Sequence, residues 1–188
     1  QQEHGDSIRQ DPGELMRTTF INLDGMRNDL DEIDYNLGIM QEYNTGVFGW
    51  ADPALDMNDS LISSRYKQQT IRRFNHAKTS VSSSWINSEK DSGYKPGGTI
   101  TAAVQEWSTR CDGKPIVDPR GLGRWSGLTF LGQKAKQLSI ITGYRSPRQT
   151  FKQNYSFSDQ QYALLTAEGV KHPNVRLHFI IDLAKQIN

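Results

Sequence analysis

An apolar run that ends abruptly in polar side chains occupies Leu37-Gly38-Ile39-Met40-Gln41-Glu42-Tyr43-Asn44. Consecutive apolar or small residues predict a strand that is buried on both faces. Open α/β sheets hold their ligand sites at the carboxyl ends of such strands, and Mg²⁺ prefers carboxylate oxygens. We therefore expect Glu42 to bind a hard divalent cation at a sheet edge, although a solvated carboxylate at a strand end would leave the same pattern.

The residues that precede this run predict the rest of an α/β unit. Leu15 to Leu23 has the β-branched and aromatic composition of a strand, and it ends at the turn-forming cluster Asn22-Leu23-Asp24-Gly25. Asn28 to Tyr35 is short and acidic, which favours a brief helix before the apolar run. A strand, a short helix and a second strand are a common unit of α/β folds.

A basic helix is predicted further along the chain. Asp59-Ser60 can cap a helix that continues to about Phe74. Its exposed face carries the cations Arg65, Lys67, Arg72 and Arg73. Such a cluster is either a solvated helix face or a surface that follows a phosphate backbone.

The middle of the chain predicts further strands, and one of them ends in a third polar cluster. Thr79 to Trp85 and Thr99 to Val104 alternate as strands do, whereas Cys111 to Gly123 has the glycines and prolines of an irregular loop. Arg124 to Leu131 and Gln137 to Thr142 predict a hairpin around Gly132-Gln133-Lys134. The polar cluster after this hairpin is Gly143-Tyr144-Arg145-Ser146-Pro147-Arg148.

Two helices are predicted to close the chain. Ser158 and Gln161 have the spacing of a capping box, and Gly169 ends that helix. Asn174 can cap the second helix. Its apolar stripe has the spacing of a core-facing surface and consists of Phe179, Ile180, Leu183 and Ile187.

Composition excludes several classes of protein. The 188 residues suffice for one domain with a substantial core, and a net charge of +1 excludes a bulk polycation. The single cysteine, Cys111, excludes an internal disulfide and a Cys/His zinc site; it suits a reducing, intracellular compartment or simple core packing. No apolar run approaches the ~18 residues of a membrane span. We therefore expect no association with membranes.

The chain divides into a short leader and one domain. Residues 1–14 are polar and interrupted by glycine and proline, so we expect a flexible leader before a domain at residues 15–188. Because the chain begins at Gln1 rather than methionine, we expect a processed product or an excised fragment.

The ordered set of motifs resembles the DNase I-like endonuclease/exonuclease/phosphatase superfamily, from about Met16 to the end of the chain. The resemblance rests on Ile21-Asn22, on Gln41-Glu42-Tyr43-Asn44, on Gly97-Gly98-Thr99, and on the strand from Ile140 that ends at Tyr144. The sequence is most similar to the nuclease-like domains of retroelement-type open reading frames. The motifs shared with those domains are Lys95-Pro96-Gly97-Gly98-Thr99, Gly123-Arg124-Trp125-Ser126, and the segment from Gln160-Gln161-Tyr162 to Phe179-Ile180-Ile181-Asp182-Leu183.

The resemblance implies a fold, a reaction and a set of site residues. It implies a partial four-layer α/β sandwich, in which two mixed β-sheets lie face to face with helices outside. It also implies hydrolysis of phosphodiesters in nucleic acid, assisted by Mg²⁺ or, as the alternative ion, Mn²⁺. In that scheme Glu42 holds the metal, Asn22 orients it and Tyr144 donates to the phosphate, while Arg145 and Arg148 bind the phosphate. Asn22, Glu42 and Tyr144 should then converge at one rim of a sheet.

One departure from the family concerns the second half of the active site. The family carries a Gly-Asp-X-Asn strand end and a terminal Asp-His pair, and this sequence contains neither. We therefore expect a domain that lacks the family's C-terminal catalytic half and that is inactive as an isolated chain. A truncated sandwich would expose an inner sheet face, which a partner, a second copy of the chain or the terminal helices would have to cover.

Two other functions remain open. The chain could be a non-catalytic structural or interaction protein built on the truncated fold. It could instead be a phosphoesterase of the same superfamily that acts on phospholipids or inositol phosphates.

Overall fold

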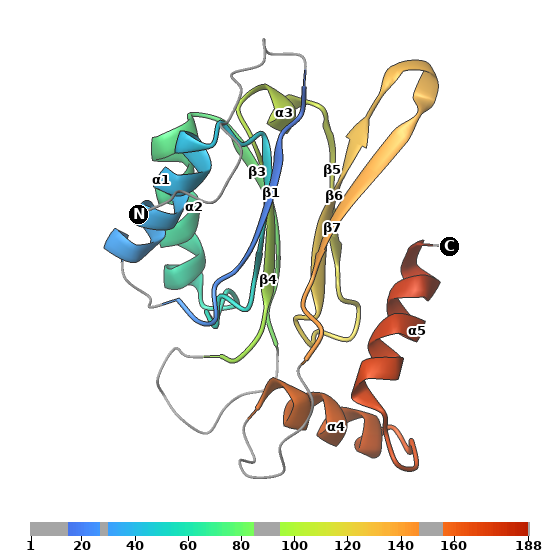
Figure 1. Cartoon of the computed structure of the whole chain (residues 1–188). Helices are drawn as coiled ribbons and strands as arrows, with labels where there is room; N and C mark the ends of the chain where they lie inside the picture. Colours follow the sequence, from blue (N-terminus) through green and yellow to red (C-terminus); the bar gives the residue numbers. More distant parts are fainter. Residues whose placement is uncertain (1–14, 27–29, 85–94, 147–155, 188) are drawn as a thin grey trace, which may run out of the picture.

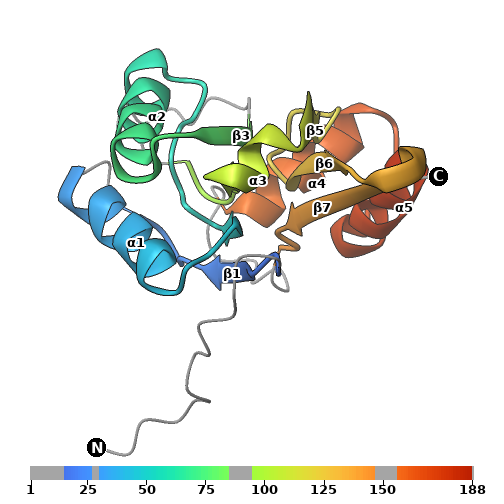
Figure 2. The same cartoon turned by 90° about the horizontal axis from the view of Figure 1, so that it is seen from above.

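The computed structural model describes residues 15–26, 30–84, 95–146 and 156–187 and shows a layered α/β fold. Two β-sheets lie face to face (Figures 1 and 2). Helices α1 (Leu30–Glu42) and α2 (Ser60–Phe74) cover the outer face of one sheet, and α5 (Val175–Ile187) lies along the outer face of the other. The predicted fold class, α/β with sheets flanked by helices, is confirmed. The predicted leader, residues 1–14, lies outside the described residues.

The first sheet is mixed. Its strand order is β1-β2-β4-β3, with β1 parallel to β2 and the other pairs antiparallel. The strands are β1 (Thr18–Asn22), β2 (Val47–Ala51), β3 (Ala77–Ser82) and β4 (Thr99–Val104). Asn22 pairs with Ala51, Ala51 with Thr99, and Thr99 with Ser82. The carboxyl ends of β1, β2 and β3 therefore share one edge with the amino end of β4.

The second sheet is antiparallel and has the order β5-β6-β7. Its strands are β5 (Cys111–Val117), β6 (Trp125–Leu131) and β7 (Gln137–Gly143). The hairpin of β6 and β7 was predicted and is confirmed. The irregular loop predicted for Cys111 to Gly123 is wrong, because its first part forms β5. Gly113 and Pro115 are unusual in strands, so they made this segment look like a loop. The register with β6 shifts between Cys111 and Pro115. Because β5 is an edge strand, it tolerates the proline.

Hydrogen bonds between the two sheets show which of their ends lie together. Thr101 of β4 donates its hydroxyl to the backbone oxygen of Ser126 at 2.9 Å and lies 2.7 Å from the Thr142 hydroxyl. The ends of β5 and β7 and the start of β6 therefore lie beside the carboxyl ends of β1 to β3, at the bottom of Figure 1. We call this edge the lower rim. It comprises residues 22–25, 52, 82–84 and 97–98 from the first sheet and residues 117–124 and 144–145 from the second.

The segment Leu37 to Met40 is not a strand, which corrects the central prediction from sequence. It belongs to α1, where Ile33, Leu37 and Met40 are fully buried and Gln41 and Glu42 are exposed. Buried residues four and three positions apart are a helical stripe, but the apolar neighbours Gly38 and Ile39 conceal this period. The second strand of the α/β unit is instead β2, which is buried over Val47 to Trp50.

The remaining helices refine the predicted caps. Asp59 caps α2 as predicted, whereas the capping box of α4 (Phe157–Ala167) is formed by Ser156 and Asp159 rather than Ser158 and Gln161. A short helix, α3 (Glu106–Thr109), follows β4. In α5 the predicted core stripe is only partly correct, because Ile180 and Ile187 are exposed and Asp182 is buried.

Two apolar clusters hold the layers together. The larger packs the first sheet against α1 and α2 and includes Trp50, Tyr66 and Ile100. The smaller lies between the sheets and includes Val47, Cys111 and Phe130. The β2, β4 and β3 strands face β7, β6 and β5, so most of the inner sheet surface is covered. None of the described helices is long and apolar enough to cross a membrane.

Candidate metal and phosphate site

Two of the three residues that were predicted to converge lie on the same rim of the structure. Asn22 ends β1 and Tyr144 follows β7, so both lie on the lower rim. Glu42 does not join them. Arg17, just before β1, donates a hydrogen bond to the backbone oxygen of Tyr43 at 2.7 Å, which places Glu42 at the opposite end of β1. The five residues of β1 separate the two ends by roughly 15 Å.

The acid at the end of the second strand is Asp52, and sequence reasoning missed it. Its Oδ1 accepts a hydrogen bond from the backbone N–H of Gly97 at 2.8 Å. Its other carboxylate oxygen has no hydrogen bond within the part of the chain that the structure describes. The helical period of Ile33, Leu37 and Met40 was the signal that could have moved the predicted strand to Val47–Ala51 and its terminal acid to Asp52.

Backbone hydrogen bonds attach the turn after β1 to Asp52. Leu23 donates to the oxygen of Ala51 at 2.9 Å, and Gly25 donates to the oxygen of Asp52 at 2.8 Å. Within the turn, the Asn22 side-chain oxygen accepts from the N–H of Asp24 at 3.3 Å. Asn22 and Asp24 are both exposed. An amide and two carboxylates thus stand on neighbouring segments of the rim.

Tyr144 is held beside this group by Phe157. The two rings lie 5.2 Å apart between centroids, and the N–H of Tyr144 donates to the oxygen of Arg124 at 2.8 Å. The Phe157 ring also fills the space beside Gly97, where an added Cβ would come within 2.3 Å of it. Phe157 therefore connects Tyr144 to the residue that hydrogen-bonds Asp52.

The side chains on the rim determine which ions it could hold. Asn22, Asp24 and Asp52 offer only oxygen donors, which suit Mg²⁺ or Mn²⁺ and not a site for zinc. No group of three or more His, Cys, Asp or Glu side chains that could hold a metal occurs among the described residues. The rim itself offers two carboxylates and one amide oxygen, which are the ligand type of a hard cation but fewer carboxylates than such a group would have. Arg145 is exposed after Tyr144, and Arg148 lies outside the described residues.

A second polar cluster fixes the loop between β5 and β6. Arg124 is 1% exposed, and its Nε and Nη2 donate to the two carboxylate oxygens of Asp118 at 2.7 and 2.8 Å. Its Nη1 donates to Asp182 of α5 at 2.8 Å. Burial disfavours the charge, but hydrogen bonds and attraction from Asp118 and Asp182 outweigh it and raise the pKa of Arg124. The cation is therefore permanent.

Comparisons with known proteins give a distant structural match. Neither the protein-family profiles nor the curated protein sequences contain a match to the chain. Among solved structures, the crystal structure of AP endonuclease LMAP from Leishmania major matches with a TM-score of 0.47 and 14% sequence identity. The match covers 70% of this chain and 40% of the endonuclease chain.

Proposed function

We propose that the lower rim is the metal- and phosphate-binding part of a Mg²⁺-dependent phosphodiesterase site that acts on nucleic acid. The observation that carries the proposal is the grouping of Asn22, Asp24 and Asp52 at the carboxyl ends of β1 and β2, where one carboxylate oxygen of Asp52 has no hydrogen bond to any described residue. Ligand sites of α/β sheets occupy this position.

Each rim residue has a role in this proposal. Asn22, Asp24 and Asp52 hold the cation, which would polarise the phosphoryl oxygen and stabilise the leaving oxygen when bound. The Tyr144 hydroxyl donates to a phosphate oxygen, and Arg145 offsets the phosphate charge. We extend the phosphate-binding role to Arg148 on sequence grounds. Glu42, the metal ligand expected from sequence, has no role at this rim.

The test compares metal binding by three variants. We expect Mn²⁺ to bind the chain weakly, with an affinity that falls at least about tenfold in Asp52→Asn and Asp24→Asn, because each loses a carboxylate ligand. Glu42→Gln is the matched control and should bind as the unaltered chain does. Mn²⁺ titration followed by electron paramagnetic resonance measures these affinities. A loss in Glu42→Gln alone would contradict the proposal.

Catalysis by this chain alone is a separate question. The Gly-Asp-X-Asn and Asp-His segments, which orient and activate the attacking water in the resembled superfamily, do not occur in this sequence. We therefore expect no nicking of supercoiled plasmid by the isolated chain with Mg²⁺. Nicking that disappears in Asp52→Asn would show that the chain carries a complete site.

A non-catalytic interaction function is the second candidate. It is favoured by α5, whose outward side exposes Leu177 and Ile180 to 50% each and Ile187 to 61%. Contiguous exposed apolar side chains commonly mark protein contacts. A chain that binds neither Mn²⁺ nor nucleic acid would favour this candidate.

A further inference from the structure

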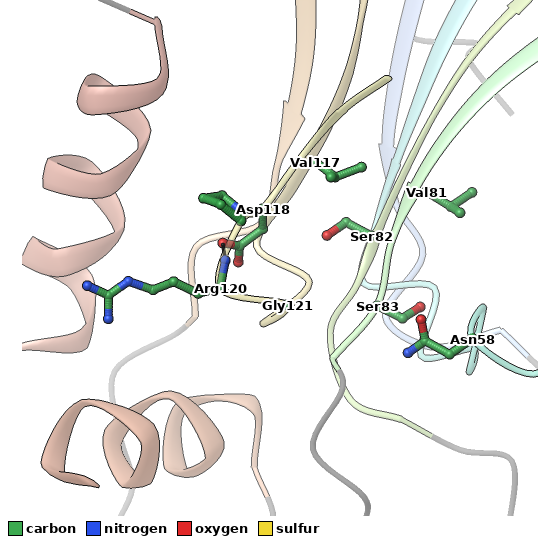
Figure 3. A pocket seen from close by; sticks show the side chains of 9 residues that line it. Asn58, Val81, Ser82, Ser83, Val117, Asp118, Arg120 and Gly121 are labelled. Atoms are coloured by element: carbon green, nitrogen blue, oxygen red, sulfur yellow. Dashed lines mark hydrogen bonds between the residues drawn. The ribbon is translucent and has the colours of Figure 1, made fainter. Parts of the chain in front are cut away.

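A pocket opens on the lower rim beside the proposed metal site. It has a volume of about 380 Å³ and lies between the end of β3 and the loop after β5 (Figure 3). Ala51 of β2, Thr99 of β4 and Ser82 of β3 are successive partners across the sheet. The pocket therefore begins about two strand spacings, roughly 10 Å, from Asp52. A nucleic-acid strand with a phosphate at the metal site could place a neighbouring nucleotide here.

The walls of the pocket combine apolar surface with unused hydrogen-bonding groups. Val117 and Pro119 contribute apolar surface. Val81 borders the pocket beside Ser82, but its side chain packs on the opposite face of the first sheet, against the cluster under α1 and α2. The Ser82 side chain points toward the loop (Figure 3), and its hydroxyl has no hydrogen bond among the described residues. Asn58 donates one side-chain N–H to the backbone oxygen of Ser84 at 3.2 Å, which leaves its amide oxygen available.

The charged groups at the pocket are already neutralised. Both carboxylate oxygens of Asp118 accept from Arg124. The Arg120 side chain extends away from the pocket toward α5 (Figure 3), where it pairs with Asp182 at 3.1 Å and with Glu168. A pocket without an unpaired cation is poorly suited to a phosphate, which needs charge-assisted donors. An uncharged, flat ligand with polar edges suits it better.

The loop that forms one wall is held in place before any ligand arrives. Asp118 accepts from Arg124 and also from the backbone N–H of Arg120 at 3.1 Å. The ion pair of Arg124 and Asp118 is buried and fixes the loop. Because the loop is already ordered, ligand binding has a smaller entropic cost.

We propose that this pocket takes an unpaired nucleobase of the nucleic-acid strand whose phosphate lies at the metal site; the proposal rests on the proposed function. The base would insert between Val117 and Pro119 on one side and the end of β3 on the other, with its edge hydrogen-bonded by Ser82 and Asn58. Amide side chains pair readily with base edges, and single-stranded segments present their bases in this way. The volume exceeds the lower end of the range for small-molecule sites.

Binding of short single-stranded DNA tests the proposal. A fluorescein-labelled oligonucleotide is titrated with the full chain once with Mg²⁺ and once in EDTA, so that the contribution of a bound metal is measured separately. Anisotropy should show that Asn58→Ala and Ser82→Val each weaken binding about three- to tenfold, because each removes a hydrogen bond. Valine is well tolerated in a strand such as β3. Gln68→Ala on the exposed face of α2 is the matched control and should bind unchanged.

An abasic oligonucleotide separates base recognition from backbone binding. The same sugar-phosphate backbone without bases should bind the unaltered chain more weakly than the base-bearing strand does. Its affinity for Asn58→Ala and for Ser82→Val should equal its affinity for the unaltered chain. Equal affinity for the base-bearing and abasic strands, or no detectable binding of either, would overturn the proposal. The metal-site proposal is judged separately by Mn²⁺ binding to Asp52→Asn.

Discussion

Arg124 shows how much structure one side chain can organise. Its guanidinium joins the rim loop, through Asp118, to α5, through Asp182, and it also lies 4.4 Å from the centre of the Trp125 ring. Arginine suits this position because its planar fork donates to both oxygens of one carboxylate and still reaches a second. The neighbouring Trp125 extends the contact, since its ring meets Phe179 of α5 edge-on.

Replacement of Arg124 should therefore destabilise the whole fold. We expect Arg124→Met to lower the free energy of unfolding by about 3–5 kcal/mol, because it leaves the buried Asp118 without its cation. Arg120→Met is the control. The Arg120 side chain is 27% exposed, and Asp182 still pairs with Arg124 in this variant. The loss of unfolding free energy should therefore be less than half as large as in Arg124→Met. Urea denaturation measures both values. Equal costs would mean that burial of Asp118 is not the source of the effect.

The elements of this fold differ in how much of their stability is local. Helix α2 carries its own start signal, because Asp59 Oδ1 accepts from the backbone N–H of Leu61 at 2.7 Å and of Ile62 at 3.4 Å. Helix α1 depends on its contact with the first sheet, where Ile33, Leu37 and Met40 are buried. Its acidic first turn, Asp31 and Glu32, complements the helix dipole only modestly.

Loss of the α2 cap gives a prediction at the scale of one element. Asp59→Ala should cost about 0.5–2 kcal/mol of unfolding free energy, because the first-turn N–H groups lose their acceptor. Ser60→Ala, one residue later, should stay within about 0.5 kcal/mol of the unaltered chain. Thermal unfolding followed by circular dichroism measures both changes. If Asp59→Ala and Ser60→Ala unfold at the same temperature, the Asp59 cap does not stabilise the protein as its hydrogen bonds imply.

The whole molecule depends on how closely the two sheets approach. Gly49 of β2 faces β7, and an added Cβ there would lie 2.2 Å from the Thr142 hydroxyl oxygen and 2.4 Å from the Phe20 ring. Among the described residues the edge strand β1 makes far less contact with the second sheet than β2, β3 and β4 do, and Phe20 on its inner side is 52% exposed. Among the described residues, exposed apolar side chains of the inner faces occur at β1 and also at Leu138 of β7, which pairs with the inner-facing Phe130 and is 51% exposed. The cover of these side chains by a partner or a second copy stays a prediction.

Two glycine-to-alanine substitutions test this close packing. Gly49→Ala should cost about 1–3 kcal/mol of unfolding free energy, because the added methyl group forces the sheets apart. Gly38→Ala is the matched control in α1, where the added Cβ would meet only the Arg73 guanidinium, at the van der Waals distance of 3.4 Å. There alanine should be neutral or stabilise the protein by up to about 1 kcal/mol. Denaturant titration gives both values, and a neutral Gly49→Ala would contradict the sheet spacing described.

The sequence by itself determined the elements whose signals are local. The strand Thr99–Val104, the hairpin of β6 and β7, and the Asp59 cap of α2 were all predicted, because turn residues, alternation and capping act over a few neighbouring residues. The polar ends of β1 and β7 were predicted for the same reason, and both lie on the lower rim. The roles of Asn22 and Tyr144 as site residues came from the family resemblance and stay a prediction.

Only the tertiary structure decided where Leu37 to Met40 and Cys111 to Val117 belong. A short apolar run satisfies a strand or a helix equally, and packing against the first sheet selected the helix. Pairing with β6 selected the strand β5, despite Gly113 and Pro115. The first outcome moves the candidate acid from Glu42 to Asp52, and the second forms the wall of the pocket that faces Ser82. Long-range contacts select among conformations that local sequence leaves close in energy. They therefore determined which residues form the candidate site.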